Sequence, residues 1–398
     1  MKAGWSTDEA PRVVPNCITK VKSERKRPFI GDQMEDCKNY QGLFYILPIQ
    51  KGYVVNWDTQ KTVWNYLFKT RYSISDGDGS STGRSLLVTE PYFNFRSCQD
   101  NLMENLFDEY GVRTLYLTNP ASLTAYKYLK ENPSKAETCL VVDAGYSFTH
   151  IIPYVKGKQV KEGIRRIDVG GKALTNHLKD VISYRQLNVL DETYVMNQCK
   201  EDCCQVSQEF LKDLEACKSG TKSKFYCQYV LPDWDTVAKR GFIRQKGDNV
   251  DQMQLIAMNN ERISIPEMLF YPSDCGLNQI GVSHSIFNSV ESLPEEVRPH
   301  LYSNIVLMGG SASFPGFRQR IENDIRSLAD HIYDVKVTLP KDPSLESWFG
   351  GQLMSSDETA MNAIRIDRRL YQEAGPGVCC DLLEKNKITF LRESILHD

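Results

Sequence analysis

Short apolar runs alternate with stretches of helical periodicity along the whole chain. Runs rich in Val, Ile, Leu, Phe and Tyr that are bounded by Gly, Pro, Asn or Asp are typical of strands, whereas apolar residues three to four positions apart indicate helices. The predicted strands cover 43–49, 53–57, 86–91, 114–118, 160–167 and 304–308, besides a hairpin over 139–153. The predicted helices cover 59–69, 98–110, 120–129, 191–214 and 317–328, with another that begins near 168. This alternation predicts an α/β fold.

The hairpin over 139–153 is the most informative stretch. Its first apolar run ends at Asp143, Gly145 allows a tight reversal, and a second apolar run follows. Backbone N–H groups of such a turn can hold a phosphate, Ser147 and Thr149 add hydroxyl donors, and Asp143 can reach a Mg²⁺ through water. The same residues also suit an ordinary hairpin in which Asp and Gly serve only the turn. The pattern alone leaves both interpretations open.

Two glycine pairs stand where predicted helices and strands meet. Gly170 and Gly171 lie where a helix opens, and Gly309 and Gly310 follow the apolar strand over 304–308. Without side chains, such positions let a ligand touch the backbone. Each pair is a weak signal by itself.

Composition indicates a globular protein with more than one domain. The chain has 398 residues, of which 41% are hydrophobic and 25% charged, and no apolar run approaches the ~20 residues that a membrane span needs. The start of the chain is polar and lacks the apolar segment of a secretory signal, which predicts the cytosol and nucleus as compartments. The net charge of −3 says little about partners, so any contact with nucleic acid would have to come from local patches.

The twelve cysteines are scattered, and no C-x-x-C motif occurs. Cys199, Cys203 and Cys204 lie at helical spacing within the predicted helix over 191–214, where we expect buried small side chains rather than a metal site. We therefore expect no structural zinc.

Three polar or amphipathic segments are candidates for partner contacts. Residues 18–29 hold five basic side chains and one acid, which indicates a solvated loop or a patch for nuclear import or DNA contact. Residues 234–258 form a polar, basic interruption of the kind that collects binding residues or remains without fixed structure. Residues 381–398 favour an amphipathic helix that packs on its own domain, frays, or docks in the groove of a partner.

Many stretches occur in the same order as in actin and resemble it closely. These stretches are Lys2-Ala-Gly, Asp8-Glu-Ala-Pro-Arg12, Gly52-Tyr-Val-Val-Asn-Trp57-Asp, Thr89-Glu-Pro, Asp143-Ala-Gly, Thr149-His150, Asn260-Glu-Arg262, Pro266-Glu, Leu269-Phe-Tyr-Pro-Ser273, Gly309-Gly310, Phe314-Pro-Gly316, Trp348-Phe-Gly-Gly351 and Tyr371-Gln-Glu-Ala-Gly-Pro376. The chain is thereby identified as a member of the actin superfamily. Other stretches, such as Tyr146-Ser-Phe-Thr-His and Tyr229-Val-Leu-Pro-Asp, are similar to its nuclear actin-related branch.

The resemblance implies an actin-like fold, in which two RNase-H-like α/β domains with accessory subdomains surround a nucleotide cleft. The implied boundaries place the first part of domain I at 1–133, with a small accessory subdomain at 16–45. Domain II then covers 134–345, with an accessory subdomain at 170–277. Residues 346–398 return to domain I and add a C-terminal extension.

The resemblance also implies a site for ATP or ADP with Mg²⁺. It is carried over to the hairpin residues Asp143, Gly145, Ser147 and Thr149, to the cleft-lining Gly171, to the ribose-side Lys200 and Glu201, and to the adenosine-side Gly309 and Gly310, with Asp143 holding the metal through water. Actin's D-N-G phosphate loop precedes the stretch that matches Lys2, so the sequence given starts after it.

Three departures from actin bear on catalysis. The glutamine that positions the attacking water aligns with Pro120, and a proline side chain cannot orient water. The second acid of the hairpin aligns with Tyr146, and the adenine-side lysine aligns near Ser344. We therefore expect a protein that is not an enzyme, and the alternative is an actin-like ATPase or a cytoskeletal relative that hydrolyses ATP slowly.

The resemblance implies a structural subunit of a Snf-type chromatin remodeller that exchanges histone two-A for its Z variant. The implied partners are the remodeller's subunits, including a small zinc-finger subunit, and the nucleosome or DNA. The implied location is the nucleus, with some of the protein in the cytoplasm. Neither membrane binding nor filament formation is expected, because residues 18–29 are basic where a filament contact would need an apolar surface.

Overall fold

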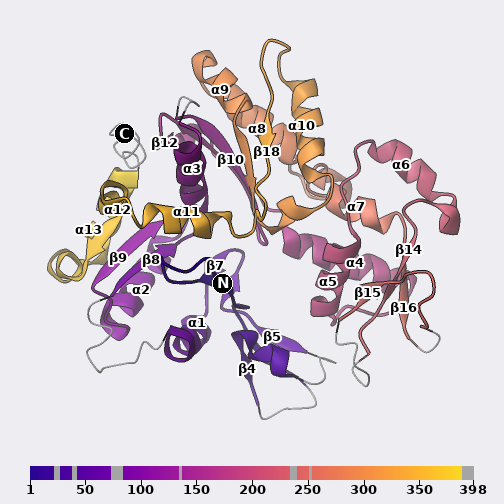
Figure 1. Ribbon diagram of the computed structural model, residues 1–398, viewed down its shortest axis with the longest axis horizontal. Coiled ribbons are helices and arrows are strands. Elements are labelled where there is room, and N and C mark those ends of the chain that lie inside the picture. The colour runs from indigo at the N-terminus through magenta and orange to yellow at the C-terminus, as the bar shows by residue number, and fades with distance from the viewer. Residues whose placement is uncertain are drawn as a thin grey trace.

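The computed structural model describes residues 1–21, 27–37, 43–72, 84–133, 137–233, 240–250 and 253–387. It is a mixed α/β structure in which two groups of sheets and helices lie side by side, as Figure 1 shows. Within these ranges no helix is long and apolar enough to cross a membrane. All twelve cysteines are free.

The central sheet has the order β12-β11-β10-β17-β18, and β13 also pairs with β11, on the same edge as β12. Its strands are β10 (Cys139–Ala144), β11 (Thr149–Val155), β12 (Lys158–Gln159), β13 (Arg165–Ile167), β17 (Ile305–Met308) and β18 (Val337–Thr338). β10 pairs antiparallel with β11 and parallel with β17. The predicted hairpin is therefore confirmed, and it lies in the middle of the largest sheet.

Both faces of this sheet are covered by helices. Leu140 and Val142 pack in one buried cluster, whereas Cys139 and Val141 pack in a second cluster on the opposite face. The first face is covered by α4 (Gly171–Arg185), α8 (Val282–Glu291), α9 (Arg298–Tyr302) and α10 (Phe317–Leu328), and the second by α3 (Pro120–Glu131), α11 (Glu346–Met354) and α12 (Glu358–Ala363). Burial on both faces explains why β10 is a continuous apolar run rather than an alternating one.

A second sheet joins the two ends of the chain. It has the order β19-β9-β8, in which β8 (Ser85–Thr89) and β9 (Thr114–Thr118) are parallel and β19 (Arg365–Asp367) is antiparallel. Helices α1 (Trp57–Asn65), α2 (Arg96–Glu104) and α13 (Arg368–Lys387) contribute to one hydrophobic cluster with this sheet. The C-terminal part of the chain thus returns to the N-terminal part.

Smaller sheets complete the fold: in Figure 1, β4 and β5 lie at the lower edge and β14, β15 and β16 at the right, whereas β7 and the N-terminus lie near the centre. They are formed by β1 (Lys2–Ala3) with β2 (Arg12–Val13), by β3 (Ile18–Lys20) with β4 (Phe29–Ile30) and β5 (Phe44–Ile46), by β6 (Ile49–Gln50) with β7 (Tyr53–Val54), and by β14 (Cys227–Val230) with β15 (Phe242–Ile243) and β16 (Leu255–Met258). Helices α5 (Thr193–Cys203), α6 (Phe210–Cys217) and α7 (Glu261–Glu267) accompany the last of these sheets. The predicted domain boundaries at 133/134 and 345/346 fall between elements and remain predictions.

The prediction of one helix over 191–214 is wrong, because α5 ends at Cys203 and α6 starts at Phe210. Between them the backbone forms hydrogen bonds with distant segments: Gln205 N donates to Arg262 O at 2.9 Å and Val206 N donates to Pro315 O at 2.8 Å. These tertiary hydrogen bonds replace the bonds that a continuous helix would have made. The expectation that the three cysteines are buried is confirmed.

Three other predicted segments differ in detail. The helix expected at 59–69 begins at Trp57, because the side chain of Asn56 caps it by accepting from Thr59 N at 2.9 Å. The strand expected at 160–167 is reduced to β13 by a helical turn over Lys161–Gly163. Residues 18–29 begin and end in the paired strands β3 and β4, and 22–26 lie outside the described residues.

The two other candidate segments are partly built into the fold. Within 234–258, β15 and β16 flank β14, and Ile256 and Met258 are fully buried. Residues 234–239 and 251–252 lie outside the described part. The first residues of 381–398 continue α13 to Lys387, where Leu383 is only 2% exposed, and the rest of that predicted helix lies outside the described residues.

Candidate functional site

The tip of the β10–β11 hairpin keeps several backbone donors free. Gly145 N donates to Phe148 O at 3.0 Å and closes the turn. The N–H groups of Tyr146 and Ser147 make no hydrogen bond with any described residue, and neither does the half-buried Ser147 hydroxyl. Adjacent free amides at a turn form a concavity that can hold an anion.

The start of α4 is fastened to this tip. Gly171 N donates to Gly145 O at 3.0 Å, and Lys172 N donates to Tyr146 O at 2.9 Å. A methyl group on Gly170 would lie 2.6 Å from Tyr146 O, so no larger residue fits this approach. The amides of Gly171 and Lys172 therefore donate to the hairpin and cannot hold an anion.

Gly171 is the point at which four segments meet. A methyl group placed on it would lie 3.5 Å from Lys200 Nζ, 3.5 Å from Tyr146 Cδ2 and 3.7 Å from Ser311 Oγ. The hairpin tip, α4, α5 and the turn after β17 thus come together, although they are far apart in the sequence. We call this place the Gly171 junction.

Lys200 is buried in the junction, with 3% of its surface exposed. Its ammonium donates to Gly171 O at 3.1 Å, Thr175 Oγ1 at 3.0 Å and Asn197 Oδ1 at 2.9 Å. Burial lowers its pKa, and the charge of the neighbouring Glu201 acts in the opposite direction. Glu201 itself is exposed and accepts from Asn197 Nδ2 at 2.9 Å, so the predicted pair separates into a buried cation and a solvated acid.

The turn after β17 closes the other side of the junction. Gly309 has φ +92°, and a side chain there would overlap the Ala144 carbonyl and approach Asp143 Oδ1 to 3.0 Å. A methyl group on Gly310 would meet nothing within 4 Å. Ser311 Oγ donates to Gly145 O at 3.3 Å. Gly309 therefore lets β17 end against Asp143, and Gly310 leaves open space.

Asp143 has a cationic neighbour that the sequence interpretation did not select. Burial raises the pKa of the Asp143 carboxyl to about 6, and the charge of the Lys2 ammonium opposes this shift. Burial likewise lowers the pKa of Lys2, which Asp143 and Asp342 partly offset. Lys2 Nζ also donates to Ser344 O. The signal that could have identified Lys2 was its place at the start of the first actin-like stretch.

The Thr149 hydroxyl forms a hydrogen bond within the chain. The side chain is 1% exposed, and Oγ1 donates to Val169 O at 2.9 Å. In this structure the Thr149 hydroxyl hydrogen is directed at the loop before α4, and the role of Thr149 as an anion donor stays a prediction.

Two of the three residues that depart from actin, Tyr146 and Pro120, occupy ordinary structural positions. Tyr146 lies at the hairpin tip with 52% of its surface exposed and its ring beside Gly171. Pro120 is the first residue of α3, a position that suits proline because its missing N–H would have no helical partner there. Neither residue provides a group that can polarise water at neutral pH.

The junction offers donors to a phosphate-type anion and one carboxylate to a metal ion. Lys2, the amides of Tyr146 and Ser147, and the Ser147 hydroxyl could all face an anion. Asp143 is a single carboxylate beside a lysine, and no group of three potential metal ligands occurs among the described residues. ATP or ADP could thus be held through phosphate contacts of Lys2 and the hairpin tip, while a magnesium ion would have one protein carboxylate.

An aromatic contact beside the junction was not predicted. The Arg166 guanidinium lies over the Phe148 ring at 3.7 Å from its centre, and Nη1 donates to Tyr53 Oη at 2.9 Å. A methyl group on Gly52 would lie 2.5 Å from the Phe148 ring. The hairpin tip is thereby packed against β6 and β7, which join the other part of the chain.

Comparisons with known proteins agree with this architecture. A family model described as Actin matches residues 1–381. The chain is 44% identical to Actin-related protein 6 of Drosophila melanogaster over 360 residues, which cover 88% of this chain and 89% of that protein. It is 36% identical to Actin-like protein ARP6 of Yarrowia lipolytica, over 92% of this chain and 91% of that protein. It is 34% identical to Actin-related protein 6 of Arabidopsis thaliana, over 95% of this chain and 96% of that protein.

Proposed function

This chain belongs to the actin family, and we propose that it acts as a non-catalytic nuclear actin-related protein, a structural subunit of a chromatin-remodelling assembly. The single observation that carries the non-catalytic part is Pro120 at the start of α3. The resemblance to actin puts the water-positioning glutamine at this residue. A proline there keeps the helix start intact and removes the side chain that orients water.

The state of the hairpin tip supports the same proposal. Tyr146 stands where the resemblance expects a second acid, so Asp143 is alone with Lys2. Phosphoryl transfer depends on charge stabilisation by metal ions and on a positioned nucleophile. A site with one carboxylate and a lysine can hold phosphate groups without activating water.

Nucleotide binding without hydrolysis is compatible with this function. Lys2, the free amides at the tip and the open space at Gly310 would face the phosphates and the sugar. A bound ATP or ADP would then link the hairpin to the turn after β17 and act as a structural ligand. The alternative function is a slow actin-like ATPase, which the family membership favours and Pro120 disfavours.

The partners and the location follow from the likeness to the nuclear actin-related proteins. We propose a Snf-type remodeller that exchanges histone two-A for its Z variant, with a small zinc-finger subunit among the direct partners. The β3–β4 hairpin, with its basic residues, would serve nuclear import or touch DNA. A filament is not part of this proposal.

Affinity purification tests the assembly. A tagged full-length chain expressed in its own cells should recover a Snf-type ATPase and a small zinc-finger protein in near-equal amounts from a nuclear extract, as measured by quantitative mass spectrometry. Recovery of actin-filament proteins from the cytoplasm, without a remodeller subunit, would contradict the proposal.

A matched set of variants tests the location. Replacement of Arg25, Lys26 and Arg27 by Gln should lower the nuclear fraction of the tagged chain. Lys212, Lys218 and Lys222 are exposed and lie elsewhere, so their replacement by Gln removes the same charge as a control. Equal nuclear fractions for the two triple variants would show that the basic hairpin has no role in import.

A further inference from the structure

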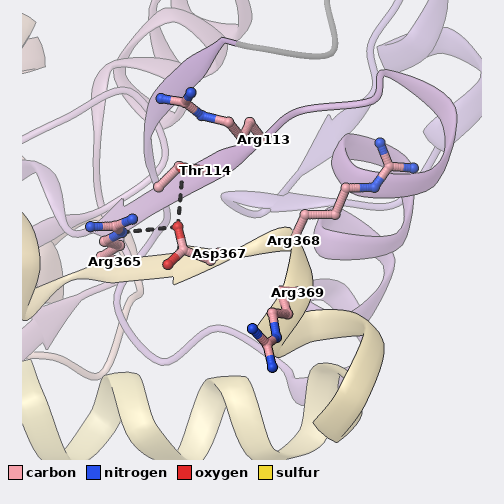
Figure 2. A pocket seen from close by; sticks show the side chains of 6 residues that line it. All are labelled: Arg113, Thr114, Arg365, Asp367, Arg368 and Arg369. Atoms are coloured by element: carbon pink, nitrogen blue, oxygen red, sulfur yellow. Dashed lines mark hydrogen bonds and ion pairs between the residues drawn. The ribbon is translucent and has the colours of Figure 1, made fainter.

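Four arginines gather where β9, β19 and α13 meet. Arg113 directly precedes β9 and Thr114 is its first residue, Arg365 and Asp367 lie on β19, and Arg368 and Arg369 open α13. Together these six residues line an open hollow of about 480 Å³ (Figure 2). We call Arg113, Arg365, Arg368 and Arg369 the arginine cluster.

The backbone holds these residues in place. Asp367 pairs with Thr114 in the antiparallel ladder between β19 and β9, and Arg368 N donates to Arg113 O at 3.0 Å. Residues directly opposite each other in such a ladder have side chains on the same face. The cluster is thus carried by a sheet edge and a helix start rather than by a loose loop.

The arginine cluster has too few acids to neutralise it. Asp367 Oδ1 accepts from Arg365 Nε at 2.9 Å and from Thr114 Oγ1 at 3.1 Å. This carboxylate therefore neutralises Arg365 and not the other three arginines. Arg369 pairs with Glu373 at 2.7 Å, but the two side chains are 85% and 62% exposed, and such solvated pairs are weak. Arg113 and Arg368 make no side-chain hydrogen bond or ion pair within the described ranges.

The helix start makes this arrangement still less favourable by itself. Arg368 and Arg369 occupy the first turn of α13, and no acid occurs there. The N-terminal end of a helix carries a partial positive charge, so cations are disfavoured in this turn. The fold therefore concentrates positive charge at a helix N-terminus, where this charge does not stabilise the folded chain. This indicates that an anion from outside the chain balances the charge of the arginine cluster.

The directions of the side chains indicate the size of that anion. Figure 2 shows Arg365 turned to Asp367, while Arg113, Arg368 and Arg369 point away from it in different directions. One small ion could not touch all of these guanidinium groups, whereas a chain with several acidic groups could. Guanidinium groups bind carboxylates and phosphates through two parallel hydrogen bonds, which suits such a ligand.

We propose that the arginine cluster binds an acidic segment of a partner protein, through carboxylate or phosphoryl groups. A protein surface that binds nucleic acid offers cations along an extended track, whereas these arginines come from three adjacent segments and lie around Asp367. The proposal does not depend on the chromatin function proposed above.

Fluorescence anisotropy of the full-length chain with a labelled oligoglutamate peptide tests this proposal. A second arm uses the same peptide with phosphoserine in place of glutamate, and a third uses duplex DNA of equal charge. The double variant Arg113→Gln with Arg368→Gln should bind the peptides at least about tenfold more weakly than the unaltered chain. The control double variant, Arg244→Gln with Arg318→Gln, removes two exposed arginines elsewhere and should bind as the unaltered chain does.

The outcomes separate the possible ligands. Tighter binding of the phosphoserine peptide would identify a phosphorylated segment, and equal or weaker binding would identify a carboxylate-rich one. The proposal is overturned if the unaltered chain binds neither peptide, or if the two double variants weaken binding equally. It is also overturned if DNA binds more tightly than both peptides and loses its affinity in the Arg113 and Arg368 variant.

Discussion

Asp143 and His150 are directly opposite each other in the β10–β11 ladder, and burial favours the neutral form of both. The pKa of Asp143 is raised to about 6, and that of His150 is lowered to about 4. His150 is 5% exposed, its Nε2 has no partner among the described residues, and Arg166 adds to the lowering. The hairpin at the centre of the candidate site therefore carries two titratable groups whose contributions to stability change with pH in opposite directions.

His150 should make the protein sensitive to acid. Below its usual pKa of 6.5 the unfolded chain binds a proton that the folded chain rejects until about pH 4, so stability falls as the pH falls through this window. His150→Phe removes the group, and the neighbouring rings of Tyr92, Phe93 and Phe148 offer an aromatic environment. The variant should gain free energy of unfolding relative to the unaltered chain as the pH falls. This gain should be about 2 kcal/mol larger at pH 4.5 than at pH 7.5.

Urea unfolding at a series of pH values measures this difference. His331, whose side chain is 94% exposed, is replaced by Gln as the control for the removal of a histidine elsewhere in the chain. A profile of His150→Phe that runs parallel to that of the unaltered chain from pH 7.5 to pH 4.5 would show that His150 does not titrate differently on folding.

Asp143 should have the opposite effect. Between its usual pKa of 3.8 and about 6 the folded chain binds more protons than the unfolded chain, so this group lowers stability as the pH rises. Asp143→Asn should therefore stabilise the protein by up to about 3 kcal/mol at pH 7.5 and have little effect below pH 4, because burial holds the pKa at about 6 even with the charge of Lys2 nearby. Thermal unfolding at both pH values checks this, and a loss of stability at pH 7.5 would contradict it.

Gly52 should be required for the contact between β6–β7 and the hairpin tip. It has φ +76°, and a methyl group would lie 2.5 Å from the Phe148 ring. Gly52→Ala should cost about 2–4 kcal/mol, because it combines backbone strain with a steric overlap. Gly247→Ala is the control, since its φ is +108° but nothing lies within 4 Å, and it should cost only the strain of about 1–2 kcal/mol. Equal losses in chemical unfolding would show that the Phe148 contact is not restrictive.

Leu383 should contribute to the stability of the chain itself. It is 2% exposed and packs with Cys379 and Cys380 in the cluster beneath α13, so Leu383→Ala should cost about 2–4 kcal/mol. Its neighbour Leu382 is 38% exposed, and Leu382→Ala should change the free energy of unfolding by less than about 0.5 kcal/mol. If both variants unfold at the same urea concentration, α13 does not pack on its own domain in solution.

The sequence was sufficient where one local pattern decided the structure. The predicted strand over 114–118 and the predicted helix over 317–328 agree with β9 and α10 to the residue. In both segments the apolar periodicity and the flanking residues that end an element are sufficient to determine its type and its ends. The hairpin and the α/β class followed from the same signals. The resemblance to actin added the order of the pieces, which periodicity cannot provide.

The remaining features depend on contacts between distant segments. The break after Cys203 arises from backbone hydrogen bonds to Arg262 and Pro315, and no local signal marks it. The hydrogen bond from the Thr149 hydroxyl to Val169 O also joins two separate segments. The approach of Lys2 to Asp143 likewise joins residues that are far apart in the sequence, so their mutual effect on pKa could not be derived from spacing.

Steady-state phosphate release by the purified full-length chain with MgATP tests the non-catalytic proposal most directly. Release should be no faster than that of Asp143→Ala, because Pro120 cannot position water and Tyr146 supplies no acid. Nucleotide retention should be followed in the same samples by equilibrium dialysis, since binding without turnover agrees with the account. Turnover at a rate comparable to actin's that disappears in Asp143→Ala would contradict it and would establish the chain as a working ATPase.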